Sequence, residues 1–236
     1  MLRTLLAWLQ TPVFGYASPA QDCVDSDADV EEISNLAAPA RAQAIAQPVR
    51  VTSFAGQVYV YDAAATLGDG ESSTATVYAG WVGDVGGREV AIKVEDVNVQ
   101  VYNDQQIWRR LQNSGGFVGL AKLIDYLPAY GDNTRFVMVT ERLGCSLHAL
   151  RAERGALPPS AMPAVAHQAL CMLREMHVRG FVHRDVKPAN LLVGRGASRK
   201  TLFVVDFGTT QPYPPIQRGQ DPSGTLMYLP RGAALG

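Results

Sequence analysis

The sequence feature that most restricts the fold is the run HRDVKPAN at residues 183–190. It follows a helical pattern that ends at Gly180, and it leads into the apolar strand pattern of residues 190–193. We therefore predict a polar loop held between a helix and a strand. On such a loop, Asp185 and Asn190 can face one centre from its two ends, so the chain must fold in a way that supports that centre.

Two other segments carry side chains that suit the same centre. Residues 202–205 predict a strand that ends at Asp206, and the Gly208 nearby favours a turn that presents the carboxylate to a hard cation. The run VAIK at residues 90–93 places Lys93 in an apolar strand, where a lysine is unfavourable unless it meets an anion. Alone, each segment has an ordinary explanation. In this order and with the loop, they predict phosphoryl transfer.

Composition excludes several other classes of protein. The 236 residues suit one large domain or two small lobes, and 21 Lys and Arg against 22 Asp and Glu exclude polyanion binding through bulk charge. We therefore expect no nucleic-acid partner. No apolar run reaches about 18 residues, so we expect no membrane span. Three cysteines without a CxxC pair favour a reducing compartment, and we expect a cytoplasmic or nuclear protein.

Residues 1–50 predict a disordered tail. An acidic stretch at residues 22–32 precedes sequence that is rich in Ala, Pro and Gln. The apolar patch at residues 5–9 is shorter than the roughly 7–15 residues of a secretory signal core. A tail or docking segment is therefore the favoured interpretation, and a targeting peptide is the alternative.

Residues 50–145 have a β-rich pattern with one helix. The helix is predicted over Asn103–Gln112, with Ile107, Trp108 and Leu111 on one face and two glycines after it. Glycines at residues 83–87 and the GDN run at residues 131–133 predict turns. The predicted strands cover residues 57–61, 76–78, 89–94, 120–126 and 135–140.

Residues 146–180 have a helical pattern. Ser146 is expected to cap a short helix that runs to Arg154, with Gly155 after it. Ser160 is expected to cap a longer helix that stops at Gly180. The predicted inner face of this helix comprises Val165, Leu170, Leu173 and Met176. Strands over residues 190–193 and 201–205 follow, so the whole pattern predicts a β-rich lobe joined to a helical lobe.

Three phrases carry a resemblance to a known family. They are VMVTERLGCSL at residues 137–147, HRDVKPAN at residues 183–190 and VVDFG at residues 204–208. With them, residues 57–231 resemble a eukaryotic-type protein kinase, most closely the casein kinase I and vaccinia-related kinase branch. The resemblance implies a bilobal, kinase-like α+β fold. It divides the chain into a tail at 1–50, a β-rich N-lobe at 51–143 and an incomplete helical C-lobe at 144–236.

The resemblance also implies an activity, an ATP-dependent protein serine/threonine kinase, with roles for single residues. Asp185 corresponds to the catalytic base that orients the hydroxyl of a protein substrate. Asn190 and Asp206 correspond to the Mg²⁺ ligands. Lys93 corresponds to the lysine on the α- and β-phosphates of ATP. Lys187 corresponds to the γ-phosphate lysine that is typical of Ser/Thr kinases.

Further positions correspond to nucleotide contacts. The glycine-rich loop begins at Gly68 and Gly70, Thr140 takes the gatekeeper position, and the backbone of Glu141 and Leu143 is expected to bind adenine. Apolar residues expected on either side of the adenine ring, which an ordinary core explains equally well, are Val77, Ala91 and Leu192.

The sequence departs from the family pattern in two nucleotide-binding elements. The glycine-rich loop is about two residues longer than G-x-G-x-x-G, with Glu71 inside it and Ala75 in place of its third glycine. We expect weakened nucleotide binding. The resemblance implies a helix Glu that pairs with Lys93, but the only acidic candidate in the predicted helix is Asp104. Since Asp is one methylene shorter, we expect either a water-bridged pair or a closer helix. Alternatively, Asp104 is only a first-turn acid that the helix dipole favours.

The end of the sequence also departs from the pattern. In the segment from Asp206 to Arg231, Thr225 is expected to contact Asp185 and Lys187, and an arginine replaces the family glutamate at 231. Hydroxyls that could be phosphorylated, with Arg184 as a receptor for the phosphate, are those of Thr209, Thr210, Tyr213 and Ser223. The family has several more helices after this segment. We therefore expect a truncated chain, or a partner that covers the base of the C-lobe.

Two other functions remain open from the sequence. The departures at Ala75, Asp104 and Arg231 favour a pseudokinase that acts as a nucleotide-binding or scaffold module. A small-molecule phosphotransferase is less favoured, because residues 183–190 have the protein-kinase form of the loop, Lys187 included.

Overall fold

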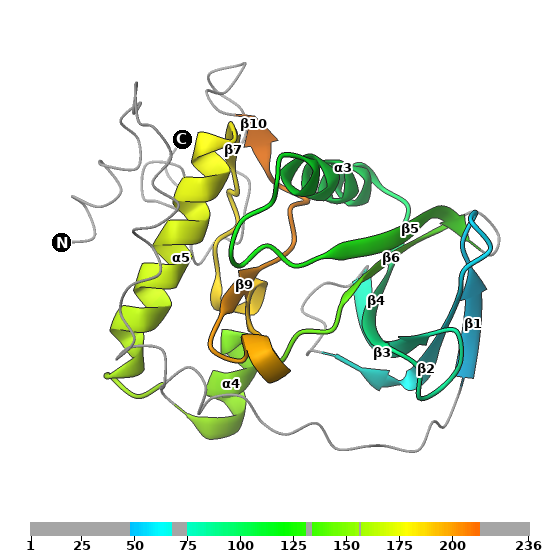
Figure 1. Ribbon diagram of the computed structural model, residues 1–236, viewed down its shortest axis with the longest axis horizontal. Helices are drawn as coiled ribbons and strands as arrows, with labels where there is room; N and C mark the ends of the chain where they lie inside the picture. Colours follow the sequence, from blue (N-terminus) through cyan, green and yellow to red (C-terminus); the bar gives the residue numbers. More distant parts are fainter. Residues whose placement is uncertain (1–47, 68–74, 131–133, 156, 213–236) are drawn as a thin grey trace.

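The β-rich part of the molecule is one six-stranded antiparallel sheet. The computed structural model describes residues 48–67, 75–130, 134–155 and 157–212. The strand order in the sheet is β1-β2-β3-β4-β6-β5 (Figure 1). The strands are β1 (Pro48–Thr52), β2 (Val58–Thr66), β3 (Ala75–Val82), β4 (Glu89–Asp96), β5 (Leu123–Tyr130) and β6 (Arg135–Glu141).

The sheet curls so that strands far apart in its order approach one another. The hydroxyl of Tyr59 on β2 donates a hydrogen bond of 2.9 Å to Oδ2 of Asp125 on β5. These strands are not neighbours in the sheet, so the bond closes the curl across the core. Burial raises the pKa of the Tyr59 hydroxyl, and the Asp125 carboxylate raises it further.

Side-chain alternation along β4 divides the sheet into two faces. Val90, Ile92 and Val94 are buried in an apolar core that strands of the same sheet share. Ala91 and Lys93 therefore point to the opposite face, because successive strand residues alternate. The predicted strand at residues 89–94 is confirmed, and it is this alternation that presents Lys93 away from the core.

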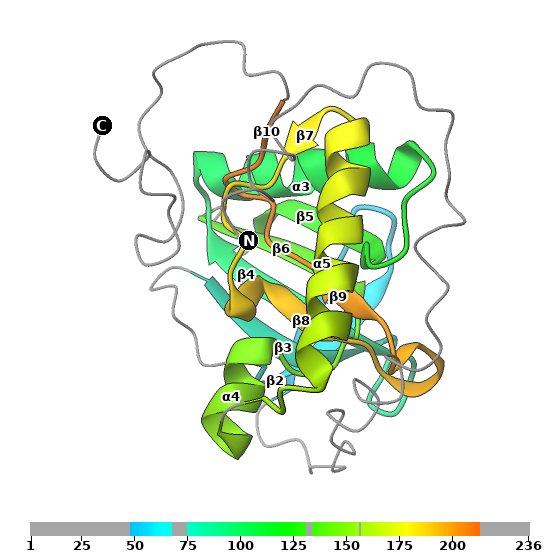
Figure 2. The same cartoon turned by 90° about the vertical axis from the view of Figure 1, so that its left-hand side faces the viewer.

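Helix α3 (Val99–Asn113) packs between the sheet and the helical part (Figures 1 and 2). It begins four residues before the predicted start, because Asn98 caps it by accepting a hydrogen bond from the N–H of Val101. The predicted inner face is confirmed, since Ile107, Trp108 and Leu111 are all buried. The indole N–H of Trp108 also donates to the Ala121 carbonyl.

The helical part contains α4 (Leu147–Arg154) and α5 (Ala161–Val178). The predicted caps of α4 are confirmed: the Ser146 side chain accepts from the Ala149 N–H, and Gly155 follows with a φ of 84°. The predicted cap of α5 is wrong in its chemistry. Ser160 precedes the helix but makes no side-chain capping bond, because its own backbone is already helical rather than extended.

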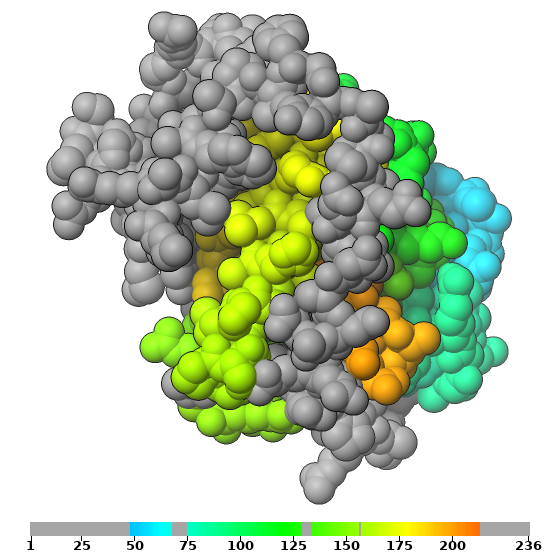
Figure 3. All heavy atoms as spheres, turned by 60° about the vertical axis from the view of Figure 1, so that its left-hand side comes forward, coloured from blue at the N-terminus to red at the C-terminus, as the bar shows by residue number. Residues whose placement is uncertain are grey.

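The buried face of α5 differs in part from the prediction. Val165 and Met176 are buried as expected, whereas Leu170 and Leu173 are only half-buried. The other buried positions are small or flexible residues, namely Ala161, Ala164 and Met172. Side chains of α5 form part of the molecular surface (Figure 3). Small residues on the inner face let α5 pack closely on β9, which the predicted face of larger side chains did not anticipate.

Short segments after α5 complete the fold. They are β7 (Phe181–Val182), the 3₁₀ turn η1 (Pro188–Asn190), β8 (Leu191–Val193), η2 (Gly196–Ser198), β9 (Leu202–Val204) and β10 (Gln211–Pro212). β8 pairs with β9 and β7 with β10, both antiparallel. A second apolar core, which includes residues of α3, α4, α5, β8 and β9, joins the β-rich and helical parts. The α+β class is confirmed.

Several predictions fall near or beyond the described residues. Residues 48–50, which we assigned to the tail, begin strand β1 and pair with β2. The strand predicted at 120–126 starts three residues later, although Leu120 forms an isolated bridge with Val204. Predictions outside the described residues concern the turn at 131–133 and Gly68, Gly70, Glu71, Tyr213, Ser223, Thr225 and Arg231. Within the described ranges, no helix has the length and apolar character to cross a membrane.

Candidate active site

Lys93 lies in the middle of β4 on the face that turns away from the apolar core. Its register partners are Val77 on β3 and Met138 on β6. The ammonium Nζ lies 3.0 Å from Oδ2 of Asp104 on α3, whose side chain is 1% exposed. The sequence prediction that Lys93 meets an anion is therefore confirmed, and the ion pair is direct.

The position of Asp104 decides between the geometries expected from the sequence. It lies in the second turn of α3, so the interpretation as a first-turn acid is wrong. The water-bridged pair is also excluded, because the helix lies close enough for direct contact with Lys93. The other carboxylate oxygen of Asp104 accepts the backbone N–H of Phe207 at 2.9 Å. One buried side chain thus connects β4, α3 and the segment after β9.

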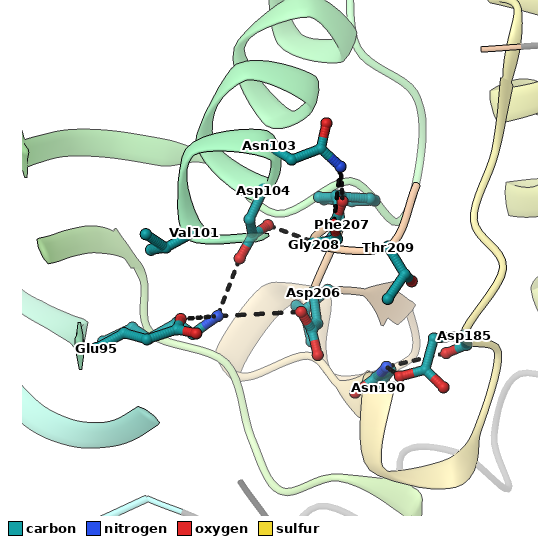
Figure 4. Close-up of polar contacts among 12 residues, drawn as sticks. Glu95, Val101, Asn103, Asp104, Asp185, Asn190, Asp206, Phe207, Gly208 and Thr209 are labelled. Atoms are coloured by element: carbon teal, nitrogen blue, oxygen red, sulfur yellow. Dashed lines mark hydrogen bonds and ion pairs between the residues drawn. The ribbon is translucent and has the colours of Figure 1, made fainter. Parts of the chain in front are cut away.

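Two more carboxylates surround the same ammonium. Oε2 of Glu95 lies 2.9 Å from Nζ of Lys93, and Oδ1 of Asp206 lies 4.0 Å from it (Figure 4). Burial alone lowers the pKa of the Lys93 ammonium, but Asp104, Asp206 and Glu95 outweigh it and hold that pKa above its ordinary value. Lys93 is therefore a cation at neutral pH. Burial raises the pKa of Asp104, while Lys93 and the Phe207 N–H oppose that shift. We call Lys93 and the three carboxylate residues Glu95, Asp104 and Asp206 the Lys93 cluster.

Asp206 ends the strand segment that contains β9, as predicted. Its backbone has a φ of 67°, a left-handed conformation that residues other than glycine seldom adopt. Its side chain is 43% exposed, far more than that of Asp104. The next residue, Phe207, is fully buried and meets the Trp108 ring edge-on at 5.2 Å. Asp206 is thus anchored by its neighbour while its own carboxylate stays accessible.

The loop at residues 183–190 is held from inside by His183. The ring is 1% exposed, its Nε2 lies 3.1 Å from the Val205 carbonyl, and its Nδ1 accepts the N–H of Asp185. A neutral imidazole with its proton on Nε2 satisfies both contacts. Burial lowers the pKa of His183, which agrees with the neutral form. The histidine therefore links the start of this loop to the strand segment before Asp206.

Asp185 and Asn190 meet across the loop, as the sequence predicted. The amide Nδ2 of Asn190 donates to the Asp185 backbone carbonyl at 2.9 Å and to its Oδ2 at 3.2 Å. Nζ of Lys187 lies 3.1 Å from the same Oδ2. These contacts fix the orientation of the Asp185 carboxylate. Because Asn190 uses its amide nitrogen here, its side-chain oxygen is the atom that can bind a metal.

The positions expected around adenine share one face of the sheet. Ala91 is the register partner of Thr140, and Val77 lies opposite Lys93, so all three side chains point the same way. All three are half-buried, and so is Leu192 on β8.

The backbone after Thr140, which is expected to bind adenine, already makes hydrogen bonds within the protein. The Glu141 N–H donates to the Lys122 carbonyl, and the Glu141 carbonyl accepts the Thr140 hydroxyl at 3.3 Å. The side chain of Leu143 is buried in the core that joins the two parts of the molecule. The structure therefore places Leu143 where the β-rich part ends, and its side chain serves packing.

The two threonines predicted as phosphorylation positions within the described residues have engaged hydroxyls. Both Thr209 and Thr210 place their Oγ1 within hydrogen-bond distance of the His183 carbonyl, and Thr210 is 2% exposed. Thr209 itself is only half-buried. Phosphorylation at Thr210 would require the segment to move.

Sequence reasoning missed two residues that contact the site. Glu95 lies two positions after Lys93 on one strand, so side-chain alternation alone could have placed both on one face. Asn103 donates from α3 to the segment after Asp206, and no sequence pattern pointed to it. Its partners are more than 100 residues away, so only the tertiary structure reveals the contact.

A comparison with protein families agrees with this geometry. The family model described as "Protein kinase domain" matches residues 61–231, more than half of the chain. The chain belongs to the protein kinase family. Proteins of this kinase family transfer a phosphoryl group from ATP to protein substrates with the help of a divalent metal. The matched range contains Lys93, Asp104, the loop with Asp185 and Asn190, and Asp206.

The donor set of this kinase domain suits one kind of metal site. Among the described residues, no group of three or more His, Cys, Asp or Glu side chains is placed to hold a metal ion. Mg²⁺ does not need such a cage, because it keeps several waters and takes one or two protein carboxylates beside substrate phosphates. The accessible carboxylate of Asp206 and the side-chain oxygen of Asn190 fit that requirement.

Proposed function

We propose that this kinase domain is an ATP-dependent protein serine/threonine kinase of the casein kinase I and vaccinia-related kinase branch. The observation that carries the proposal is the 4.0 Å distance between Nζ of Lys93 and Oδ1 of Asp206. It brings the expected phosphate-binding cation next to the expected metal ligand, although 113 positions separate them in the chain. The phrases at residues 137–147 and 204–208 support the branch.

Each side chain has a task in this proposal. Bound ATP with Mg²⁺ would supply the phosphoryl group and the metal charge. Asp206 and Asn190 would hold the metal, and Lys93 would bind phosphate oxygens as a permanent cation. Asp185 would orient the substrate hydroxyl and accept its proton at a carboxylate oxygen. Residues proposed to surround the adenine are Val77, Ala91, Thr140, Glu141, Leu143 and Leu192.

Lys187 supports the choice of serine and threonine over tyrosine. Its ammonium lies 3.1 Å from the Asp185 carboxylate, so a cation stands beside the proposed proton acceptor. From this position it can neutralise charge on the transferred phosphoryl group. The resemblance associates this lysine with Ser/Thr kinases.

A transfer assay with radiolabelled ATP tests the proposal. The full chain is incubated with Mg²⁺ and with generic acidic and basic proteins, and the phosphorylated residue type is then identified. Wild-type protein should label serine or threonine, Asp206→Asn should not, and Asp84→Asn should label like wild type. Asp84 is the matched control because it lies in the exposed turn between β3 and β4. Equal labelling by wild type and Asp206→Asn would reject the proposal.

One observation favours a second candidate, a pseudokinase that binds nucleotide without turnover. Asp104, Glu95 and Asp206 all contact Lys93, so ATP phosphates must compete with three carboxylates for one ammonium. A thermal-shift measurement with MgATP separates the candidates when it is combined with the transfer assay. Stabilisation by MgATP without any labelling would support the second candidate.

Other sequence-based expectations stay predictions. They are the division into lobes at residue 143, a cytoplasmic or nuclear location, a partner that covers the base of the helical part, and weakened binding through the glycine-rich loop.

A further inference from the structure

Asn103 on α3 contacts the segment that follows Asp206 at three points. Its amide Nδ2 lies 3.2 Å from the Phe207 carbonyl, 2.8 Å from that of Gly208 and 3.0 Å from that of Thr210 (Figure 4). An amide NH₂ group has two hydrogens, so three acceptors share two donors. One side chain thus contacts three carbonyls within four residues of the backbone that leaves the proposed metal ligand.

The next helix residue, Asp104, holds the same segment as a hydrogen-bond acceptor rather than a donor. Asp104 accepts the N–H of Phe207, while Asn103 donates to carbonyls of the same segment. The backbone also lies close to the helix at Gly208, where an added Cβ would be 3.4 Å from Gln100. Two adjacent helix residues therefore supply an acceptor and a donor group for one segment. Residues 206–210 are thus linked to α3 by hydrogen bonds of both kinds.

The segment needs such support because its first residue is strained. Asp206 has a left-handed φ of 67°, which an L-residue adopts only where its surroundings impose it. Phe207 and Thr210 are buried, so their carbonyls depend more on protein donors than exposed ones would. The contacts that the Asn103 amide makes as a donor to three carbonyls are well placed to impose the turn that directs the Asp206 carboxylate toward Lys93.

We propose that Asn103 is a positioning residue that holds residues 206–210 against α3 and so keeps the Asp206 carboxylate in place for a divalent metal. The part that concerns the metal rests on the proposed function; the part that concerns the segment does not. Asn103 acts through the backbone of this segment, since its amide donates to the carbonyls of residues 207, 208 and 210.

Hydrogen exchange on the full chain without nucleotide tests the positioning. Asn103→Leu keeps the shape of the side chain and removes its donors, and Asn113→Leu makes the same change at the exposed last residue of α3. Peptides that cover residues 204–212 should exchange about tenfold faster in Asn103→Leu than in Asn113→Leu, because several hydrogen bonds to buried acceptors are lost. Equal exchange in the two variants would overturn the proposal.

A titration of Mg²⁺ with ADP, followed by thermal shift, tests the consequence for the metal. The Mg²⁺ concentration at half effect should rise about fivefold in Asn103→Leu and stay at the wild-type value in Asn113→Leu. If Asn103→Leu exchanges faster but has an unchanged half-effect Mg²⁺ concentration, Asn103 stabilises the segment without positioning Asp206 for the metal. That result would overturn the positioning role. If wild-type protein shows no shift with Mg²⁺ and ADP, the proposed function fails, while the exchange result still decides whether Asn103 holds the segment.

The test does not depend on one substitution. Circular dichroism shows whether Asn103→Leu folds, and if it does not, Asn103→Ala and Asn113→Ala repeat both measurements. A return of slow exchange in Asn103→Gln, which retains the amide donors, supports the proposal. Exchange in Asn103→Gln as fast as in Asn103→Leu counts against it.

Discussion

The Lys93 cluster and the loop at residues 183–190 build the two sides of the proposed site in different ways. In the cluster, Lys93 contacts Asp104 from 11 residues away and also lies near Asp206, and Asp104 in turn binds the Phe207 N–H from 103 residues away. In the loop, Asn190 contacts Asp185 from only five residues away. One side is assembled by long-range packing and the other by a local turn.

The two sides also differ in how their charges are balanced. The cluster places a nearly inaccessible carboxylate, that of Asp104, against an ammonium that is one-fifth exposed. The loop holds its carboxylate, that of Asp185, with an amide and an ammonium on one oxygen. Loss of Lys93 leaves the buried carboxylates of Asp104 and Glu95 without their ammonium, whereas loss of Asn190 leaves hydrogen bonds unmade while Lys187 still pairs with Asp185. The cluster should therefore be the more sensitive side.

The largest effect is expected for Lys93→Met. Removal of the ammonium leaves Asp104 and Glu95 buried without a counter-charge, so the free energy of unfolding should fall by about 3–5 kcal/mol. Urea denaturation measures this. The control is Arg50→Met, which breaks an ion pair whose side chains are 62% and 75% exposed and should change stability by less than about 1 kcal/mol. Equal losses in the two variants would contradict the claim that the buried ion pair stabilises the fold more than the exposed one does.

A smaller effect is expected for Asn190→Leu. The substitution keeps the size of the side chain but leaves the carbonyl and Oδ2 of Asp185 without their donor, which should lower the free energy of unfolding by about 1–3 kcal/mol. Transfer activity should also fall. Urea denaturation beside Asn113→Leu provides the comparison. A loss greater than that of Lys93→Met would reverse the expected order of the two sides.

Asp104→Glu tests whether the short acid fits its site. The family glutamate adds one methylene to a fully packed position, where the existing ion pair is already direct, so stability should fall by about 1–2 kcal/mol without a gain in activity. Urea denaturation and the transfer assay measure the two effects, with Asp84→Glu as the exposed control. A variant that is both more stable and more active would show that the pair in the wild type is imperfect.

The smallest effect concerns pH and His183. Burial holds its pKa in the fold below the ordinary 6.5, although the Val205 carbonyl, Asp206 and Asp185 raise it and Lys187 lowers it. Below about pH 6.5 the unfolded chain therefore binds more protons than the folded one. The contribution of neutral His183 to the free energy of unfolding is fully present above that pH. It falls as the pH drops, by at most about 1.4 kcal/mol per pH unit.

Urea denaturation between pH 5 and pH 8 measures this slope. His183→Gln should reduce it, while the remaining slope reflects other groups such as His177, whose pKa burial also lowers. His148→Gln makes the same substitution at a histidine that is only half-buried and serves as the comparison variant. Identical slopes in wild type and His183→Gln would show that His183 does not titrate differently in the fold.

The same contrast explains how far the sequence predicted the site. Asp185 and Asn190 were placed correctly because a loop of eight residues between a helix and a strand leaves few arrangements. Lys93 was placed in the correct strand because the apolar, β-branched run that predicts β4 is a local pattern. The start of α3 was missed by four residues, since the cap at Asn98 is a side-chain contact that periodicity does not register.

The sequence by itself determined the order of the reactive groups, the α+β class and the local geometry of the loop, because these depend on neighbours along the chain. Only the tertiary structure decided that Asp104 reaches Lys93 directly, that Glu95 and Asp206 join it, and that Asn103 holds the segment after Asp206. Those contacts depend on how closely α3 packs between the sheet and β9. That distance is set by side chains from many segments in the shared core, and no local pattern encodes it.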